Sequence, residues 1–352
     1  MRGSAAFRTG VAPGGALAPG WVKNELWRRA RAVPSLDLRF AENKSLVDAT
    51  TGASLVTFTR ASSGTFVGSD GVLRTAVTNE PRFDHNPTTG ESLGLLVEEQ
   101  RTNLLLNSAT LSTQSVTVAA AANTLSFYGT GTVTLTGVST AGPLVGTGAN
   151  NRVSLTFTPT VGVLILTVSG SVTNAQLEAG AFPTSYIPTT TAAATRSADV
   201  ASISGSNFSS WYNQTEGTVF AEMDRNTAIS SSSTVVSIND NSSNNRLYNF
   251  RQDSASALTV ISATGGTLDG ALGVTLANTS NRNRVAAAQS LNNLAAAANG
   301  GTVLSDTSVA MPTVTQVQIG NVTGTSYFNG TIRRICFWPT RLPANTLQSI
   351  TQ

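Results

Sequence analysis

The chain has 352 residues and few charges: 12% of its residues are Asp, Glu, Lys or Arg, while 31 residues are glycine. This composition, with its many β-branched residues, predicts an all-β protein of two or three domains with abundant turns. The single cysteine, Cys336, excludes an intrachain disulfide framework, and one histidine leaves no usual His/Cys zinc site. No run of about 18 apolar residues is present, so no transmembrane helix is expected, and no signal peptide is expected because the N-terminus lacks the apolar core of about 7–15 residues that one requires.

The basic residues are concentrated at the N-terminus. Residues 1–34 hold six Lys or Arg and one Glu, a charge of +5, whereas the remaining 318 residues hold sixteen basic and eighteen acidic side chains, a charge of −2. A nucleic-acid-binding domain usually has a basic face on its folded part. The nearly neutral body therefore predicts no specific nucleic-acid partner.

Residues 1–34 are expected to form an N-terminal arm. Residues 1–20 are rich in Gly, Ala and Pro and cannot bury enough apolar area to fold alone. Residues 21–32 predict a short helix, which needs a partner because about twelve residues are marginal as an isolated helix. The residues expected to dock this arm on another protein are Trp21, Leu26, Trp27 and Arg28. The alternative is a helix that folds back onto its own body.

Residues 35–108 predict a series of short strands. Ser35–Phe40 alternates polar and apolar residues, as a half-buried strand does, and Val56–Thr59 is a second strand. Turn residues such as Ser63-Gly64 separate the strands that follow. Leu93–Val97 is apolar on both faces, which predicts a buried strand.

Four motifs in this segment carry a resemblance to a known group of proteins. They are Arg60-Ala-Ser-x-Gly-Thr-Phe66, Asn79-x-Pro-Arg-Phe83, Gly94-Leu-Leu-Val-Glu98 and Thr102-Asn-Leu104. In this order and spacing they resemble a module of many bacteriophage tail fibre, spike and minor structural proteins, and the resemblance covers residues 35–352. It implies a virion protein, usually a homotrimer, attached to other virion proteins by its N-terminal arm.

Residues 109–191 predict a small β-sandwich. Arg152 is the one charged residue between Ala109 and Leu177, and short strands recur at regular intervals. The expected strands lie near residues 115–119, 124–128, 131–137, 151–157, 161–169 and 171–177.

The end of this segment carries a second resemblance. Thr173–Pro188 is similar to the QLE-x-G-x-x-PTSYIPT ending of carbohydrate-binding-like jelly rolls in phage proteins. This resemblance implies a sugar-binding ancestry. A structural spacer is the favoured interpretation of this copy over a retained glycan site, because Phe127, Tyr128 and Phe157 are expected to pack in its core.

After a linker over residues 189–195, residues 192–352 resemble a laminin-G or concanavalin A-like sandwich of two antiparallel sheets. The segments that carry this resemblance are Glu216–Asp224, Gly320-Asn321, Tyr327–Trp338 and Arg341–Leu347. On the first of them, Val219 and Phe220 should face opposite sides of a strand.

Three further structural expectations concern this last domain. Residues 284–298 have good helix propensity, but Asn299-Gly300-Gly301 is a hairpin signal, so we predict strands. Pro343 should start a short helix over residues 344–350. Cys336 should lie in a core strand as a small hydrophobic residue.

The candidate catalytic carboxylates are incomplete. Glu222 and Asp224 are placed like the acids on one strand of some concanavalin A-like glycosidases. The position of the next carboxylate holds Asn226 or Thr227 instead. We therefore expect an exposed strand face here and no enzyme activity.

Other polar residues are expected to have structural roles. Glu98 and Glu99 are adjacent on a strand, so they should point to opposite faces and be solvated or salt-bridged. His85 should lie on a surface loop. The side chains that could supply oxygen ligands for calcium fit no known loop motif; they are Asp224, Asp240, Asn241 and Asn329. Neither a metal nor a cofactor is expected.

The candidate sugar-binding residues flank the start of the last sandwich. Proteins hold sugar rings on aromatic faces that have Arg or Asn beside them. The residues predicted to bind glycan on this basis are Trp211, Tyr212, Arg246, Tyr248 and Arg251. For Trp211, ordinary packing in the core is the favoured alternative.

Together these features predict a bacteriophage virion structural protein, a tail fibre, spike or other appendage that recognises a host-surface polysaccharide. The alternatives are a decoration, collar or head component without a ligand, and a polysaccharide-degrading enzyme. The expected fold is all-β, with tandem antiparallel β-sandwiches (a jelly roll and a concanavalin A/laminin-G-like domain) behind an extended N-terminal arm. The expected partners are other virion proteins and two further copies of the chain, with no membrane, specific nucleic acid or cofactor.

Overall fold

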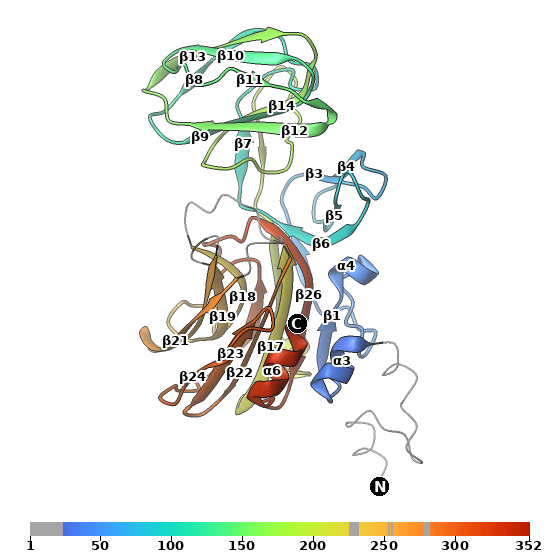
Figure 1. Cartoon of the computed structure of the whole chain (residues 1–352), viewed down its shortest axis with the longest axis vertical. Coiled ribbons are helices and arrows are strands. Elements are labelled where there is room, and N and C mark those ends of the chain that lie inside the picture. Colours follow the sequence, from blue (N-terminus) through green and yellow to red (C-terminus); the bar gives the residue numbers. More distant parts are fainter. Residues whose placement is uncertain (1–23, 225–231, 253, 255, 277–281) are drawn as a thin grey trace.

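The computed structural model describes residues 24–224, 232–252, 254, 256–276 and 282–352. The described part is almost entirely antiparallel β-structure, which confirms the predicted all-β class. Two sandwiches lie one above the other along the longest axis of the molecule (Figure 1). Among the described helices, none combines the length and the apolar character that a membrane span requires.

The larger sandwich holds most of the C-terminal half of the chain. Its first sheet has the strand order β24-β23-β22-β17-β26-β6-β5, and β1 also pairs with β26. These strands are β1 (Leu36–Leu38), β5 (Phe83–His85), β6 (Ser92–Val97), β17 (Glu216–Asp224), β22 (Arg282–Ser290), β23 (Asn293–Ala298), β24 (Leu304–Asp306) and β26 (Gly330–Trp338). Strand β26 is long enough to pair with β6 near Gly330 and with β1 near Phe337. Residues 35–108 thus complete a sheet that is otherwise built from the end of the chain.

The second sheet of this sandwich has the order β2-β16-β25-β18-β19-β20-β21. Its strands are β2 (Thr57–Thr59), β16 (Val200–Ser204), β18 (Ser233–Asn239), β19 (Arg246–Gln252), β20 (Ala257–Thr264), β21 (Thr267–Thr275) and β25 (Gln316–Ile319). Here too an early strand, β2, pairs with a late one, β16.

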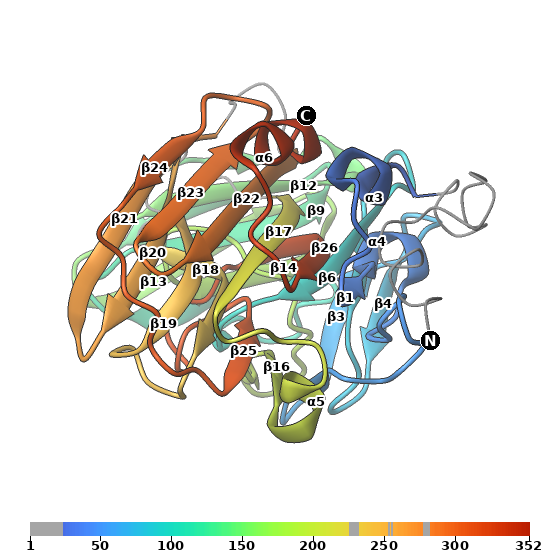
Figure 2. The same ribbon diagram turned by 90° about the horizontal axis from the view of Figure 1, so that it is seen from below.

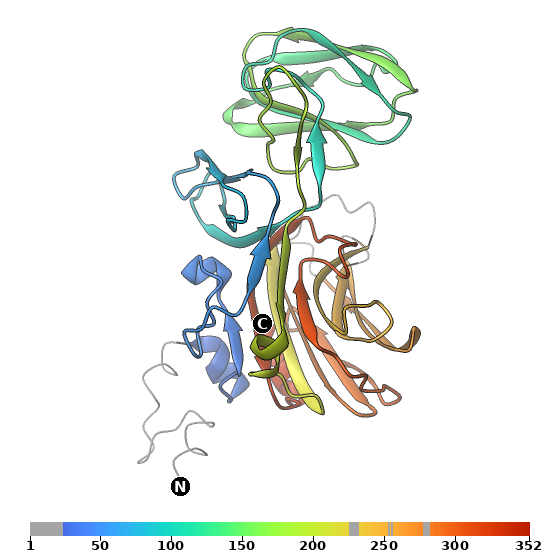
Figure 3. The same cartoon turned by 180° about the vertical axis from the view of Figure 1, so that it is seen from behind.

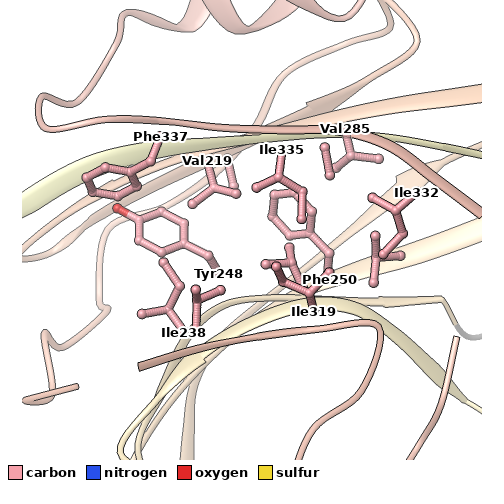
Figure 4. Close-up of a cluster of buried hydrophobic side chains, with 14 of the residues drawn as sticks. Val219, Ile238, Tyr248, Phe250, Val285, Ile319, Ile332, Ile335 and Phe337 are labelled. Carbon is pink, nitrogen blue, oxygen red and sulfur yellow. The ribbon is translucent and has the colours of Figure 1, made fainter. Parts of the chain in front are cut away.

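The side chains between these two sheets form the main hydrophobic core. Figure 4 shows Val219, Ile335 and Phe337 of the first sheet facing Tyr248 and Phe250 of the second. Burying side chains of this size contributes roughly 1.5–3 kcal/mol each. Alternation along β17 puts Val219 into this core and the next residue into a separate apolar cluster on the outer face, as predicted.

Short helices flank the larger sandwich. They are α3 (Glu25–Ala30), α4 (Phe40–Asn43), α5 (Gly205–Ser209) and α6 (Ala344–Ile350). Helices α3 and α6 lie side by side on the outer face of the first sheet (Figure 2). The predicted helix over residues 344–350 is confirmed.

Helix α3 folds back onto the body of the protein. Leu26 and Trp27 are buried, and Trp27 Nε1 donates a hydrogen bond to Asp37 Oδ2 at 3.0 Å. The structure thus shows the alternative considered for this segment, a helix that folds back onto its own body. Leu26 and Trp27 pack within the chain in this arrangement. Arg28 is exposed, and Trp21 lies outside the described residues.

The smaller sandwich is built from two sheets, with the orders β11-β10-β13-β8 and β12-β9-β14. Its strands are β8 (Gln114–Val118), β9 (Asn123–Gly129), β10 (Thr132–Gly137), β11 (Leu144–Val145), β12 (Gly148–Phe157), β13 (Gly162–Ser169) and β14 (Val172–Ala179). All six predicted strands are confirmed, and β11 was not predicted. Phe127 and Phe157 are buried in the core as expected, whereas Tyr128 is only half-buried.

Two small sheets connect the sandwiches. Strands β7 (Arg101–Asn103) and β15 (Ala194–Arg196) pair as a ribbon that runs between the two bodies (Figure 3). Strands β3 (Gly64–Val67) and β4 (Leu73–Ala76) form a hairpin beside the junction. The expected linker over residues 189–195 therefore ends in a strand, because its last residues pair with β7.

The ambiguous segment at residues 284–298 forms strands, as predicted. All of β23 pairs with residues Val285–Ser290 of β22. At the next turn Asn299 (φ 49°) and Gly300 (φ 71°) are left-handed, and Gly301 N–H donates to the Ala298 carbonyl at 2.8 Å. The type I′ hairpin turn requires positive φ at both central residues, and Asn-Gly is a favoured pair at these positions. Cys336 is buried in β26, also as predicted.

We expect Gly94→Ala to lower the free energy of unfolding by more than about 3 kcal/mol. Gly94 has φ +96°, and a Cβ there would lie 2.2 Å from the Ile332 carbonyl oxygen. Two costs add up in this variant. A residue with a Cβ costs roughly 1–2 kcal/mol in the left-handed conformation. Overpacking against the Ile332 carbonyl costs roughly 1–3 kcal/mol more. Gly52→Ala is the matched control, because Gly52 (φ +77°) has no atom within 4 Å of the added Cβ. Equal losses for both variants in urea unfolding would contradict this account.

Candidate functional site

Five charged side chains are buried together where the two sandwiches meet. They are Arg60, Arg82, Glu98, Arg196 and Asp199, and none is more than 4% exposed. Asp199 pairs with Arg60 at 3.1 Å and also with Arg82. Glu98 pairs with Arg82 and with Arg196, each at 2.8 Å. We call this set of five residues the seam network.

The seam network joins segments that are far apart in the sequence. Arg60, Arg82 and Glu98 belong to three of the four phage-like motifs. The smaller sandwich joins through Ser185 of its PTSYIP ending, whose N–H and Oγ each donate to a Glu98 carboxylate oxygen at 2.7 Å. The motifs thus meet in space, although no local pattern in the sequence indicates that they do.

Pairing outweighs burial for the carboxylate at the centre of the network. Burial by itself raises the pKa of Glu98, but Arg196, Arg82 and the Ser185 hydrogen bonds overcome it and lower the pKa to about 2. Burial lowers the pKa of Arg60, whereas the two carboxylates outweigh burial and raise the pKa of Arg82. Glu98 is therefore ionised over the whole physiological range.

Other motif residues make room for these charges and orient them. A Cβ on Gly64 would lie 3.0 Å from Arg60 Nε and 3.2 Å from Arg82 Cδ. Asn79 Oδ1 accepts the backbone N–H of Arg60 at 3.0 Å. A larger residue at position 64 would therefore displace the guanidinium groups.

Asn103 fastens the start of the smaller sandwich. Its Nδ2 donates to the carbonyls of Ala175 and Ile187, at 3.0 and 2.8 Å. Its Oδ1 accepts the N–H groups of Leu105 and Leu177, each at 3.1 Å. The fourth motif thus ties the entry strand to the strand and ending that close the same sandwich.

A cavity of about 640 Å³ opens beside the seam network, between the two sandwiches and the β3–β4 hairpin. Volumes of this size are typical of small-ligand sites. We call it the seam cavity. Its wall includes Asp84, His85, Tyr128, Arg152, Tyr186 and Arg333.

His85 reaches the cavity from the end of β5. It is 5% exposed, so the prediction of a surface-loop histidine is wrong: the strand continues through His85, and the turn begins only at Asn86. Its Nδ1 lies 3.0 Å from the Val67 carbonyl oxygen. Because a carbonyl only accepts, Nδ1 carries a proton, and Nε2 has no partner among the described residues.

Asp84 lies beside this histidine. The pairing of β5 with β6 shifts register between Asp84 and His85, and such irregularities re-aim side chains near sites. Asp84 Oδ1 accepts the Val67 N–H at 2.6 Å, yet burial raises the pKa of Asp84 to about 6. Because this folded-state pKa lies above the ordinary value of 3.8, the Asp84 contribution to stability falls as the pH rises towards about 6.

Tyr128 and Arg152 come from the smaller sandwich. Burial raises the pKa of Tyr128, the Arg152 charge lowers it and the Asp84 charge raises it, so these three groups lie near one another. Arg152 Nη2 donates to Ser126 Oγ at 2.8 Å, and Nη1 donates to the Thr184 carbonyl. The sequence signal that could have identified Arg152 as a site residue is that it is the one charged residue between Ala109 and Leu177.

Ion pairs occupy the wall that the larger sandwich provides. Asp224 pairs with Arg333, and Glu222 pairs with Arg282. Glu222 and Asp224 are only 8% and 9% exposed, so the expected exposed strand face is wrong. Arginines from β22 and β26 cover this face, which the pattern of β17 alone could not indicate.

A second cavity, of about 450 Å³, adjoins the first. The two share Thr65, Val67, Leu73, Pro87, Tyr128 and Tyr186. The described residues that line the second cavity include no charged side chain. Together the cavities form a longer space with one charged end and one neutral end.

The aromatic residues predicted to bind sugar pack in the larger sandwich instead. Trp211 is 5% exposed and Tyr248 is 1% exposed, and Figure 4 shows Tyr248 directed into the main core. Tyr212 stacks on Phe208 with ring centroids 4.5 Å apart, and burial raises the pKa of Tyr212. Packing, the alternative considered for Trp211, is therefore what the structure shows for that ring.

The two arginines predicted beside them lie on β19. Arg246 Nη1 donates to the Ser243 carbonyl at 2.6 Å, and Arg251 is half-buried. Neither belongs to the wall of the seam cavity. The structure thus does not bring the predicted glycan residues together as one exposed group.

The remaining polar predictions concern ion pairs and metals. Glu99 pairs with Arg101 at 2.5 Å, which confirms the expected salt bridging of this acidic cluster. Asp240 accepts hydrogen bonds from Ser242 and Asn245 of its own loop. Among the described residues, no group of three or more His, Cys, Asp or Glu side chains is placed to hold a metal ion.

No protein family matches the chain, and no curated protein matches it either. Among solved structures, a mutant of NanB sialidase from Streptococcus pneumoniae is 13% identical over 42% of this chain and 26% of its own, with a TM-score of 0.34. The Ruminococcus gnavus IT-sialidase CBM40 is 15% identical over 40% of this chain and 84% of its own, with a TM-score of 0.32. Trypanosoma rangeli sialidase in complex with the inhibitor DANA is 12% identical over 43% and 26%, with a TM-score of 0.34. The chain thus spans 26% of these sialidases, and likeness at this level assigns no function.

We expect Glu98→Gln to lower the free energy of unfolding by about 3–5 kcal/mol, because it leaves buried arginine charge uncompensated. Glu98 has a folded-state pKa of about 2 against an ordinary value of 4.5. Since this pKa is lowered, the stability it contributes is complete above pH 4.5 and is lost as the pH falls towards about 2. Urea unfolding at several pH values should show the wild-type advantage shrinking in that window.

The control for this prediction is Glu25→Gln. Glu25 forms an exposed pair with Arg29 at 2.6 Å, and pairs of this kind add little to stability. This variant should unfold like the wild type at every pH. Equal stability of the two variants, or a Glu98→Gln loss that does not change with pH, would show that the seam network is not the critical interaction.

Proposed function

We propose that this protein is a glycan-binding component of a bacteriophage particle, of the tail fibre, spike or appendage type, and that the seam cavity is its binding site. The observation that carries the proposal is the cavity of about 640 Å³, where the Tyr128 ring lies beside buried polar atoms that lack partners. A sugar ring requires both an apolar surface and hydrogen-bonding groups that fix its orientation. The buried ions beside the cavity hold its walls in one arrangement.

The arrangement favours binding over hydrolysis. Asp84, with its pKa raised to about 6, is the kind of carboxyl that serves as a general acid in a glycosidase. A glycosidase also needs a second carboxylate across the scissile bond. The other carboxylates on this wall are held by arginines: Glu91 and Asp224 by Arg333, and Glu98 by the seam network.

The assignment to a phage particle rests on the sequence resemblance. The structure supports it indirectly, since Arg60, Arg82 and Glu98 share one architectural role in the seam network. With α3 packed on the body, attachment to other virion proteins would fall to residues 1–23. These residues carry three basic side chains and no acidic one. A homotrimer remains a prediction of the resemblance.

We expect Tyr128→Ala to weaken glycan binding about tenfold, because it removes the apolar area that the ring would bury against a sugar, worth roughly 25 cal/mol per Å². A glycan array with the full chain identifies ligands, and calorimetry with the strongest of them measures the loss. Thr134→Ala, at an exposed position on β10, is the control and should bind like the wild type. Equal affinity of the two variants would exclude the seam cavity, and binding to no glycan would end the proposal.

We expect the full chain to be incorporated into phage particles, and a chain lacking residues 1–23 to be incorporated less. The deletion spares Asn24, whose side chain caps α3 by accepting the Trp27 N–H at 3.3 Å, so the body should keep its unfolding midpoint. Mass spectrometry of purified particles, with the full chain expressed in parallel, gives the measurement. Undiminished incorporation of the shortened chain would move attachment to another surface.

A further inference from the structure

We infer that the seam cavity selects anionic sugars, and that Arg152 receives the negative charge of the sugar. The inference rests on the proposed function and specifies the ligand class of that same site. It comes from a contrast among the arginines of the cavity wall. Arg282 and Arg333 are each paired with carboxylates of the chain, whereas Arg152 is not.

Arg152 is held in place without being neutralised. Its two hydrogen bonds go to the neutral acceptors Thr184 O and Ser126 Oγ. Its Nε has no partner, and no carboxylate lies within 4.0 Å of the guanidinium, in the part of the chain that the structure describes. A guanidinium has five N–H donors; the buried Nε–H is enclosed by the protein, so one N–H on each of Nη1 and Nη2 remains for a ligand.

The surroundings of Arg152 make a structural role a poor explanation of its charge. It is the one charged residue between Ala109 and Leu177, and the carboxylate that follows on β14, Glu178, accepts hydrogen bonds from Gln176 and Thr184 instead of pairing with it. Its neighbour Asp84 is directed to the Val67 N–H and lies beyond ion-pair distance. A half-buried cation without a counter-ion is costly, and an oxyanion matched to the planar guanidinium removes that cost.

Two neighbouring groups indicate a sugar rather than a bare anion. His85 Nε2 is buried without a partner among the described residues, and in the neutral ring it can accept a hydrogen bond from a sugar hydroxyl, because Nδ1 carries the ring hydrogen. The half-buried Tyr128 ring offers an apolar face. An inorganic phosphate or sulfate would use Arg152 and leave both of these groups unused.

The adjoining neutral cavity indicates a chain longer than one sugar. It continues past Tyr128 and Tyr186 for about another 450 Å³ without a charged side chain among the described residues. A glycan that occupies both cavities would place its anionic unit at Arg152 and uncharged units beyond the tyrosines. The expected ligand is therefore an oligosaccharide whose charged units are separated by neutral ones.

The test compares glycans that share a backbone and differ in charge. A glycan array carries neutral oligosaccharides, their carboxylated forms, and their sulfated or phosphorylated forms, and the full chain is tested for binding to each. We expect the wild type to prefer anionic members, Arg152→Gln to lose at least about tenfold in affinity for them, and Arg152→Lys to lose less. Affinity for neutral members should not change. Arg28→Gln makes the same charge change at an exposed position outside the cavity and should bind like the wild type.

The possible results of the array distinguish the source of the negative charge, a failure of the inference and a failure of the proposed function. Preference for carboxylated over sulfated or phosphorylated members, or the reverse, identifies the chemical source of the charge. Neutral glycans bound through Tyr128 with no effect of Arg152→Gln would overturn the inference and leave the proposed function intact. Inorganic phosphate that competes at Arg152 without any preference for anionic glycans would mean an adventitious ion only and would also overturn it. Binding to no glycan at all, with both Arg152 variants folded by their unfolding midpoints, would remove the proposed function as well.

Discussion

The five charges of the seam network determine how the two sandwiches are held together. Moving guanidinium and carboxylate groups out of water is expensive, and only a complete set of partners offsets that cost. Glu98 needs Arg82, Arg196 and Ser185 at the same time, and these come from three distant segments. A partly assembled junction would leave a buried charge unpaired. The network therefore favours one relative placement of the two bodies over neighbouring ones.

This constraint explains why a cavity can persist between two otherwise independent cores. Each sandwich buries its own apolar cluster, and neither cluster extends into the other. Apolar contact across the junction would have filled the space, whereas directional ion pairs and hydrogen bonds hold the walls apart. Residues of both bodies, such as Tyr128 and Arg333, therefore line the cavity without belonging to either core.

Local sequence patterns predicted individual strands and turns correctly. The regular spacing of short strands located the smaller sandwich, alternation predicted which faces of β17 Val219 and Phe220 occupy, and the Asn299-Gly300 turn overruled the helix propensity of the alanine-rich segment before it. The same patterns could not show that β1 and β6 would join β26, because register across hundreds of residues is decided by tertiary pairing. They could not show that Tyr248 packs in the core for a related reason: the sequence around an aromatic residue near an arginine looks the same whether the ring faces solvent or the core.

The junction contains residues that hold the two sandwiches together and residues that line the cavity, and the sequence resemblance identifies the first kind. The phage-like motifs contribute Arg60, Arg82 and Glu98, which are buried and hold the architecture. Tyr128 and Arg152 line the cavity yet lie outside every motif. A module recognised by its buried charges therefore identifies how the sandwiches are joined and says nothing about what the space between them binds. The ligand has to be inferred from groups whose charge or hydrogen-bonding capacity is not used within the protein, and Arg152 is the arginine on this wall that pairs with no carboxylate of the described residues.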